Sequence, residues 1–287
     1  MICLNCGKEI PEKEIFCSRC TVPTTSQNDL EVVCENGTVT ITGCKKNLSA
    51  VNIPPYIKKH TKRLLVRKIG RSAFADSNIE TVIIPDTVGI IDENSFRNCK
   101  KLRRVFISEG TEIIGKSAFE HCVMLDNVIL PEGLSVIESS LFAGCENLSE
   151  IFFPAGVVKI GHSAFGRCVS LKEVVFPEKL TAIGSYAFYG CTGLESVLFS
   201  ENITNIGEFA FEECSALTEI VLPESLAEIG IYAFKNCRML ESVNIPESLS
   251  AAGQFMFDGC RRIRSAVIPE RLKYAVCFDT PDIVDIK

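Results

Sequence analysis

Four cysteines near the N-terminus form the pattern in this sequence with the most direct chemical meaning. Cys3 and Cys6 are separated by two residues, and Cys17 and Cys20 repeat that spacing after ten intervening residues. Two such pairs can present four thiolates tetrahedrally, which is the arrangement that Zn²⁺ adopts in structural sites. Two disulfides or a redox pair are the alternatives. Because four cysteine ligands leave no open position for water, we predict one structural, non-catalytic zinc per chain.

The segment that carries these cysteines, residues 1–23, is too short to bury a core of its own, so a metal is expected to hold it together. With Gly7 after the first pair and Thr21 after the second, it resembles the short zinc ribbons found at the start of many prokaryotic proteins. This resemblance implies a small separate zinc-binding module. The polar residues 24–29 that follow are expected to form a flexible linker.

An internal repeat of 23 residues accounts for most of the remaining chain. A cysteine lies three residues after nearly every repeating phenylalanine, and leucine or isoleucine lies six residues after it. With alanine usually before the phenylalanine, these spacings predict a short helical turn with one apolar face. The nine phenylalanines are Phe74, Phe96, Phe119, Phe142, Phe165, Phe188, Phe211, Phe234 and Phe257, and the cysteines run from Cys99 to Cys260, with Ser77 in the first repeat.

After each predicted turn the apolar periodicity falls to two, which predicts a short strand. Proline ends this strand in seven of the nine repeats, and an Ile-Gly pair follows in most of them, where glycine is expected to permit a bend with positive φ. One 23-residue unit cannot bury its apolar residues alone, so neighbouring units must share a core. The predicted fold is therefore an α/β repeat solenoid, in which each coil contributes one parallel strand and one short helical turn.

The repeat also carries a family resemblance. The pattern Ile-Gly-x-x-Ala-Phe-x-x-Cys-x-x-Leu, seen from Ile160 and again from Ile183, resembles the BspA-like leucine-rich repeat family. This resemblance implies a curved, right-handed solenoid that binds proteins or surfaces and has no catalytic residues to carry over. Many members of the family are exported bacterial surface proteins.

The solenoid is expected to span residues 30–287 and to need a cover at each end. Residues 30–44 contain two β-prone runs around Asn36-Gly37, which predicts a β-hairpin. A degenerate coil with Leu48, Val51 and Ile53 completes an N-terminal cap at 30–68. Residues 273–287 lack the repeat signature and are predicted to form a C-terminal closing strand or tail.

The repeated cysteines invite a metal-wire or redox-sensor interpretation, but we favour small buried residues with raised pKa values. Free thiols together with a zinc site favour a reducing compartment, and hence the cytoplasm. No apolar run is long enough to span a bilayer. Because the cysteine pattern starts at Cys3, no room is left for a signal peptide, and we expect a chain that is neither membrane-spanning nor exported.

Charge is unevenly distributed along a chain whose net charge is −6. Residues 45–116 hold 15 Lys and Arg against 7 Asp and Glu, whereas residues 117–287 hold 12 against 23. The basic patch can attract phosphate or an acidic partner, although an acidic chain without interleaved aromatic residues is atypical of a nucleic-acid binder. An adaptor for nucleic acid or an acidic partner is thus the alternative function. The patch comprises Lys58, Lys59, Lys62, Arg63, Arg67, Lys68, Arg103 and Arg104.

The middle position of each predicted strand should face the concave side of the solenoid, and it is apolar in eight of nine repeats. Beside it lies a polar position, as in Arg104 and Glu150. An exposed apolar stripe beside polar residues predicts a protein-binding groove, with Phe106 and Phe152 as anchors. The alternatives are a sheet packed on both faces or a stripe covered by a dimer partner. The candidate residues are Ile83, Phe106, Ile129, Phe152, Val175, Leu198 and Val221.

Catalysis is not expected. The three histidines, His60, His121 and His162, lie in a basic run and at two different repeat positions, and no nucleophile or phosphate-loop motif accompanies them. The sequence therefore predicts a non-catalytic scaffold that binds a protein partner and leaves the oligomeric state open.

Overall fold

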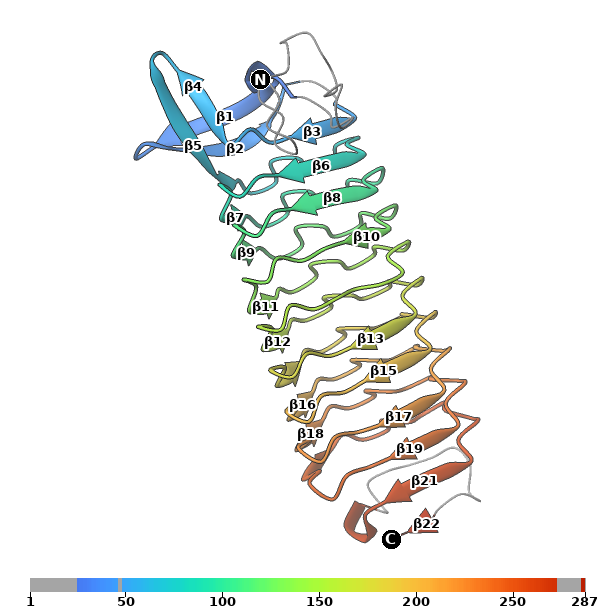
Figure 1. Ribbon diagram of the computed structural model, residues 1–287. Coiled ribbons are helices and arrows are strands. Elements are labelled where there is room, and N and C mark those ends of the chain that lie inside the picture. Colours follow the sequence, from blue (N-terminus) through green and yellow to red (C-terminus); the bar gives the residue numbers. More distant parts are fainter. Residues whose placement is uncertain (1–24, 46–47, 273–284, 287) are drawn as a thin grey trace. The chain divides into compact units, whose positions relative to one another are not determined.

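The structure is a computed structural model that describes residues 25–45, 48–272 and 285–286 (Figure 1). These residues belong to two compact units, Met1–Leu134 and Ser135–Lys287. Each unit is a β-solenoid built from the 23-residue repeat, and each is described below by itself.

The predicted hairpin lies near the start of the described part of the first unit. Strand β1 (Leu30–Glu35) pairs antiparallel with β2 (Thr38–Cys44). Asn36 and Gly37 connect them with φ angles of 49° and 77°, the left-handed conformation that a tight hairpin turn requires. The hairpin prediction is therefore confirmed. Ahead of it, residues 25–29 pack on this unit: Thr25 is buried and its hydroxyl accepts the Asn52 backbone N–H at 2.8 Å.

One parallel sheet of the first unit contains the longer strands of its coils. Its order is β10 (Asn127–Val128), β8 (Arg104–Ile107), β6 (Thr81–Ile84) and β3 (Ala50–Asn52). The register places Val51 beside Val82, and Val82 beside Val105. All three valines are buried, so the degenerate coil predicted before the first full repeat is confirmed.

A second sheet of the first unit has the order β1-β2-β5-β7-β9, with β4 paired to β5. Strands β7 (Ile90–Ile91) and β9 (Ile113–Ile114) are short. Strand β7 pairs in parallel with β5 (Lys62–Ile69) on one side and with β9 on the other. Strand β4 (Tyr56–Lys59) forms an antiparallel hairpin with β5, which extends outward in Figure 1. Neither this hairpin nor the row of short strands was predicted from the sequence.

The second unit repeats the two-sided arrangement. Its short strands form one sheet in the order β11-β12-β14-β16-β18-β20, and its longer strands form β13-β15 and β17-β19-β21-β22. The short strands are β11 (Val136–Ile137), β12 (Lys159–Ile160), β14 (Ala182–Ile183), β16 (Asn205–Ile206), β18 (Glu228–Ile229) and β20 (Ala251–Ala252). The longer strands are β13 (Glu173–Val175), β15 (Ser196–Leu198), β17 (Glu219–Val221), β19 (Ser242–Asn244), β21 (Ser265–Ile268) and β22 (Asp285–Ile286).

The repeated phenylalanines form the centre of the core in each unit. All nine are buried. In the first unit Phe74, Phe96 and Phe119 stack with centroid separations of 5.2 and 5.4 Å. In the second unit the stack runs from Phe142 to Phe257, with separations between 5.2 and 5.6 Å. These distances fit offset stacking, and the predicted alignment of the phenyl rings is confirmed within each unit.

The predicted helical turn around each phenylalanine is wrong. Around Phe74, residues 73, 75 and 77 donate backbone N–H groups to carbonyls three residues earlier, which makes successive tight turns. Phe74 itself donates to the Ser95 carbonyl of the next coil at 2.7 Å, and Asp76 donates to Arg97. Ser72 and Asp76 have positive φ angles, as have the equivalent residues of the later coils. A residue in this left-handed region ends a right-handed helix, so the segment is a ladder of turns bonded between coils. In the described residues, the helical elements are two 3-10 turns, Gln27–Asp29 and Glu270–Leu272.

The glycine of the Ile-Gly pair has a different role from the predicted positive-φ bend. Gly184 does not have positive φ, but a Cβ placed on it would lie 2.7 Å from the backbone of Gly161 in the preceding coil. A Cβ on Gly207 would likewise lie 2.4 Å from the Ser185 backbone nitrogen. Glycine therefore allows close approach of neighbouring coils at this corner.

At the C-terminal end, β22 pairs in parallel with β21, Val267 beside Asp285. This confirms a closing strand at residues 285–286, while the rest of the predicted cap, 273–284, lies outside the described residues. No helix in the described parts of the chain is long and apolar enough to cross a membrane.

Candidate functional site

In four successive coils of the second unit, one apolar side chain lies on the outside, in a longer strand or at the equivalent position of the coil that contains Phe152. Side chains alternate across a strand, so in β13 Val174 points into the core while Glu173 and Val175 point out. The parallel register sets Val175 beside Leu198 of β15. Phe152, Val175, Leu198 and Val221 form what we call the apolar row of the second unit, and each is between 52% and 71% exposed.

The row ends toward the C-terminus of the unit. Asn244 and Val267 occupy the same strand position, as the register of β17, β19 and β21 shows, but both are only half-exposed. Between β15 and β17 the surface is hollowed, with Leu198 and Val221 in contact with the hollow. Its polar lining comes from Glu195, Ser196, Glu201, Thr218 and Glu219.

The first unit presents the equivalent strand position with different surroundings. Phe106 is 53% exposed and Ile129 is 70% exposed, whereas Ile83, which pairs with Phe106, is half-buried. Two residues before the apolar position, this unit carries Arg104 and Asn127, both exposed. The second unit carries Glu150, Glu173, Ser196 and Glu219 there.

The structure divides the predicted basic patch between two sheets. Lys58, Lys59, Lys62 and Arg63 surround the tip of the β4–β5 hairpin, with Lys58 opposite Arg63 and Lys59 opposite Lys62. Arg63 lies over the Tyr56 ring at 4.7 Å. Arg67 and Lys68 lie further along β5, while Arg103 and Arg104 lie at the start of β8 in the other sheet. The hairpin tip is thus a compact cationic cluster of its own.

Within the basic patch, Lys68 has a charged partner in the first unit. Its ammonium group lies 2.6 Å from the Asp92 carboxylate. Partial burial raises the pKa of Asp92, but hydrogen bonds from Lys68 and from the Glu93 backbone, together with the nearby positive charges, outweigh it and leave that pKa below its usual value. Among the described residues, the four cations of the hairpin tip form no such ion pair.

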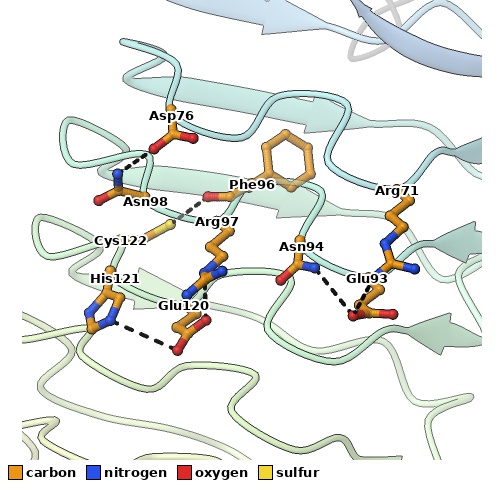
Figure 2. Close-up of polar contacts among 10 residues, drawn as sticks. All are labelled: Arg71, Asp76, Glu93, Asn94, Phe96, Arg97, Asn98, Glu120, His121 and Cys122. Atoms are coloured by element: carbon orange, nitrogen blue, oxygen red, sulfur yellow. Dashed lines mark hydrogen bonds and ion pairs between the residues drawn. The ribbon is translucent and has the colours of Figure 1, made fainter.

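Polar side chains on the turn segments link one coil to the next (Figure 2). Arg71 lies 3.1 Å from Glu93, and Arg97 lies 2.7 Å from Glu120, which also lies 3.8 Å from the His121 ring. Within each Arg–Glu pair, the opposite charges neutralise each other at the surface. His60 occupies the β4–β5 turn and His162 packs against the Tyr186 ring, so the three histidines do not share a site.

The repeated cysteines are buried, as predicted, and they are also hydrogen-bond donors. The Cys122 thiol donates to the Phe96 carbonyl of the preceding coil at 3.2 Å (Figure 2), and Cys191 donates to Phe165 at 3.1 Å. Loss of solvation on burial raises the pKa of Cys191 to about 12. Cys99 differs: hydrogen bonding with Cys122 is the main cause that lowers its pKa, against the effect of burial.

A second surface row, not predicted from the sequence, lies on the turn segments of the second unit. Tyr186 stacks on Phe209 at 4.7 Å, Phe209 on Tyr232 at 5.2 Å, and Tyr232 on Phe255 at 5.7 Å. All four have positive φ. The signal was present in the sequence, because an aromatic residue precedes the core phenylalanine by two positions in four consecutive repeats.

The predicted zinc ligands Cys3, Cys6, Cys17 and Cys20 lie outside the described residues, so the zinc ribbon stays a prediction. Within the described ranges, no group of three or more His, Cys, Asp or Glu side chains is arranged to hold a metal ion.

Comparisons with known proteins agree with this architecture. The model of the BspA type leucine-rich repeat region, in six copies, matches residues 67–195 and 158–279. Because these matches cover well over half of the chain, the protein belongs to the BspA type leucine-rich repeat family. None of the curated proteins compared with the chain matches it.

Several solved structures are similar to this chain to different degrees. A leucine-rich repeat protein of T. pallidum is 28% identical, with a TM-score of 0.54 and coverage of 75% of this chain and 90% of that chain. A leucine rich cell surface protein of Faecalibacterium prausnitzii is 24% identical, with a TM-score of 0.53 and coverage of 85% and 88%. A leucine-rich repeat protein of Bacteroides ovatus is 24% identical, with a TM-score of 0.40 and coverage of 92% and 99%.

Proposed function

We propose that this protein is a non-catalytic scaffold that binds a protein partner through the outward face of its longer strands. One observation carries the proposal: Phe152, Val175, Leu198 and Val221 are each more than half exposed in successive coils. A solvent-facing strand position is ordinarily polar, whereas neighbouring exposed apolar side chains are typical of interaction surfaces. Membership of a leucine-rich repeat family supports the same function.

Phe152 and Phe106 are the proposed anchors in their respective units. Both are large aromatic side chains, which contribute more than most residues to protein interfaces when a partner buries them. The coil of Phe152 is joined to the next coil of the row, since the backbone N–H of Lys172 donates to the Ser149 carbonyl at 3.2 Å.

The test replaces Phe152 or Phe106 by serine, one at a time, in the full-length chain. Ile231→Ser is the matched control, because Ile231 is 37% exposed but lies on a turn segment away from the longer strands. Partners captured from an extract of the source cells are identified by mass spectrometry, and their affinities are then measured by calorimetry. We expect Phe152→Ser to weaken binding by about tenfold or more, as loss of an interface hot spot does.

Unchanged affinity in both phenylalanine variants would contradict the proposed face, provided that circular dichroism shows native folding. Equal losses in Ile231→Ser would contradict it as well, because they would show that the effect does not depend on the longer strands.

The proposal includes two features carried by the sequence alone. A structural zinc bound by Cys3, Cys6, Cys17 and Cys20 is supported by their paired spacing. A cytoplasmic location is supported by the buried cysteine column, whose thiols serve as hydrogen-bond donors in their reduced form.

The β4–β5 hairpin favours a second candidate function, the binding of nucleic acid or another polyanion. Lys58, Lys59, Lys62 and Arg63 gather at its tip without an ion-pair partner among the described residues. Phosphate binding of this kind weakens steeply as salt rises. Lys58→Gln with Lys59→Gln should therefore reduce salt-dependent binding to duplex DNA, while the exposed control pair Arg261→Gln with Arg262→Gln should not. Binding that is equally reduced in both pairs would exclude the hairpin as the site.

A further inference from the structure

The apolar row of the second unit is bordered by carboxylates on both sides. On the side of the strand starts lie Glu173 in β13, Glu195 just before β15, and Glu219 in β17, all exposed. On the side of the strand ends lies Glu201, also exposed. The hollow between β15 and β17 shows that these residues share one surface, because Glu195, Glu219 and Glu201 line it together with Leu198 and Val221.

The repeat extends this pattern beyond the hollow. The corner that closes each longer strand places a glutamate three residues after the apolar position, at Glu178, Glu201 and Glu224 in successive coils, and all three are exposed. The backbone geometry of that corner is regular, since Leu180 donates to the Pro177 carbonyl and Leu226 to Pro223, each at 3.0 Å. The acidic border therefore follows the row across several coils.

In the described part of the unit, one basic side chain pairs with a carboxylate of this border. Lys172 pairs with Glu195 at 2.9 Å. Among the described residues, Glu201 and Glu219 take part in no ion pair. A purely apolar partner laid on Leu198 and Val221 would remove water from these charges without replacing it, which is energetically costly.

From this arrangement we infer that the second unit binds a cationic amphipathic polypeptide segment, with apolar side chains on the row and lysine or arginine on both flanks. The inference rests on the proposed function and adds the chemistry of the partner. Complementary charges at the border of an interface direct partner choice and speed association, while the apolar centre supplies contact area.

The first unit marks the limit of this preference. At the border position that carries Glu150, Glu173 and Glu219 in the second unit, it carries Arg104 and Asn127. A cationic segment would meet Arg104 beside Phe106 there, so like charges would oppose binding. The preference for a cationic partner is thus assigned to the second unit alone.

The experiment measures binding of a fluorescein-labelled amphipathic peptide of leucine and lysine to the full-length protein by fluorescence anisotropy. Two peptides of equal length serve as comparators, one with glutamate in place of lysine and one with serine in place of leucine. We expect the leucine-lysine peptide to bind about tenfold or more tightly than either comparator, with an affinity that falls as salt rises.

Protein variants separate the face from the general acidity of the chain. Glu201→Gln with Glu219→Gln should weaken binding of the leucine-lysine peptide about tenfold or more. Glu208→Gln with Glu213→Gln removes the same charge from exposed positions on a turn segment and should leave the affinity within about twofold. Leu198→Ser should weaken binding without changing the charge.

The outcomes distinguish this inference from the function on which it rests. If Leu198→Ser weakens peptide binding while the two glutamate pairs behave alike, the cationic preference is overturned and the binding face stands. If neither Leu198→Ser nor Phe152→Ser changes the binding of any partner or peptide, the proposed function is overturned too. Sedimentation experiments measure self-association. If the protein self-associates and Lys58→Gln with Lys59→Gln abolishes this, the face binds a second copy of the chain and the inference is overturned.

Discussion

At the residue scale, the repeated cysteine owes its place to more than its size. The Phe165 carbonyl accepts the backbone N–H of Cys168 in its own coil and the thiol of Cys191 in the next, each at 3.1 Å. A carbonyl oxygen has two lone pairs, and this arrangement satisfies both inside the core. The interpretation of cysteine as an apolar filler was therefore incomplete, because alanine would fill part of the space but would not donate.

Because these thiols are buried, we expect the protein to lose stability as the pH becomes alkaline. Loss of solvation raises the pKa of Cys191 to about 12 and raises those of Cys168, Cys214 and Cys237 well above 9.0. Above pH 9 the unfolded chain releases protons that the folded chain retains, so the free energy of unfolding falls as pH rises. Each thiol contributes a slope of up to about 1.4 kcal/mol per pH unit, and its effect is absent below the unfolded pKa.

Urea unfolding at a series of pH values between 8 and about 11 measures this slope. Cys191→Ala should show a shallower decline than the wild type, since one of the raised thiols is gone. Identical slopes for the two proteins would contradict the proposed linkage.

Because the core phenylalanines stack on one another, truncating one of them should lower the free energy of unfolding strongly. Phe188 is fully buried and stacks on Phe165 and Phe211, each at 5.2 Å. Phe188→Ala should lower the free energy of unfolding by about 3 to 5 kcal/mol, because it leaves a cavity between neighbouring coils. Phe209→Ala, in the half-buried surface row, should cost about 1 kcal/mol through lost stacking. Urea unfolding measures both variants. Equal losses of unfolding free energy would contradict this prediction, because the buried stack and the surface row would then contribute alike.

At the element scale, close approach of the backbone joins one coil to the next. The turn segment of each coil donates alternately within the coil and to the next coil, and the corner after the short strand brings the backbones together at glycine. The two surface rows follow from the same regularity, because a side chain at one repeat position meets its equivalent one coil away. The aromatic residues of the second row occupy left-handed positions that cost bulky side chains conformational energy, and their stacking offsets part of that cost.

Gly184→Ala tests the close approach. A Cβ at Gly184 would lie 2.7 to 2.9 Å from the backbone atoms of Gly161 and His162, so the coils must separate slightly. We expect a loss of about 1 to 3 kcal/mol in the free energy of unfolding, the usual cost of overpacking. Gly133→Ala is the control, because its Cβ would meet its nearest neighbour at an ordinary 3.8 Å. If both variants unfold at the wild-type midpoint, glycine is not required at this corner.

At the scale of the whole molecule, one repeat serves two units whose outward chemistry differs. Both bury the same column of phenylalanine, cysteine and leucine. The first unit adds a cationic hairpin at β4–β5, whereas the second borders its apolar row with glutamates. Core positions are constrained by packing against the neighbouring coil, but outward positions are free to vary, so a common scaffold can present distinct surfaces.

The four N-terminal cysteines predict the metal content of the whole chain. Protein purified without added metal should contain about one zinc per chain, as expected for a four-cysteine structural site. Mass spectrometry of the metal content measures this directly. Cys17→Ser with Cys20→Ser should abolish it, while Cys191→Ala, in the solenoid core, should not. Less than half an equivalent in the wild type would contradict the zinc assignment.

The sequence by itself determined the solenoid, its 23-residue coil, the burial of the nine repeated phenylalanines and the hairpin at Asn36-Gly37. These features repeat, or depend on a few adjacent residues, so their pattern is visible without coordinates. Only the tertiary structure decided that the segment around Phe74 is a ladder of turns, because a spacing of three suits both turns and helices. The hydrogen bond from Phe74 to Ser95 that distinguishes them joins different coils. The missed β4–β5 hairpin is local, but its turn at His60-Thr61 carries no Asn-Gly or other glycine signal of a tight hairpin. The acidic border of the apolar row is visible only in the structure, because its glutamates come from separate coils.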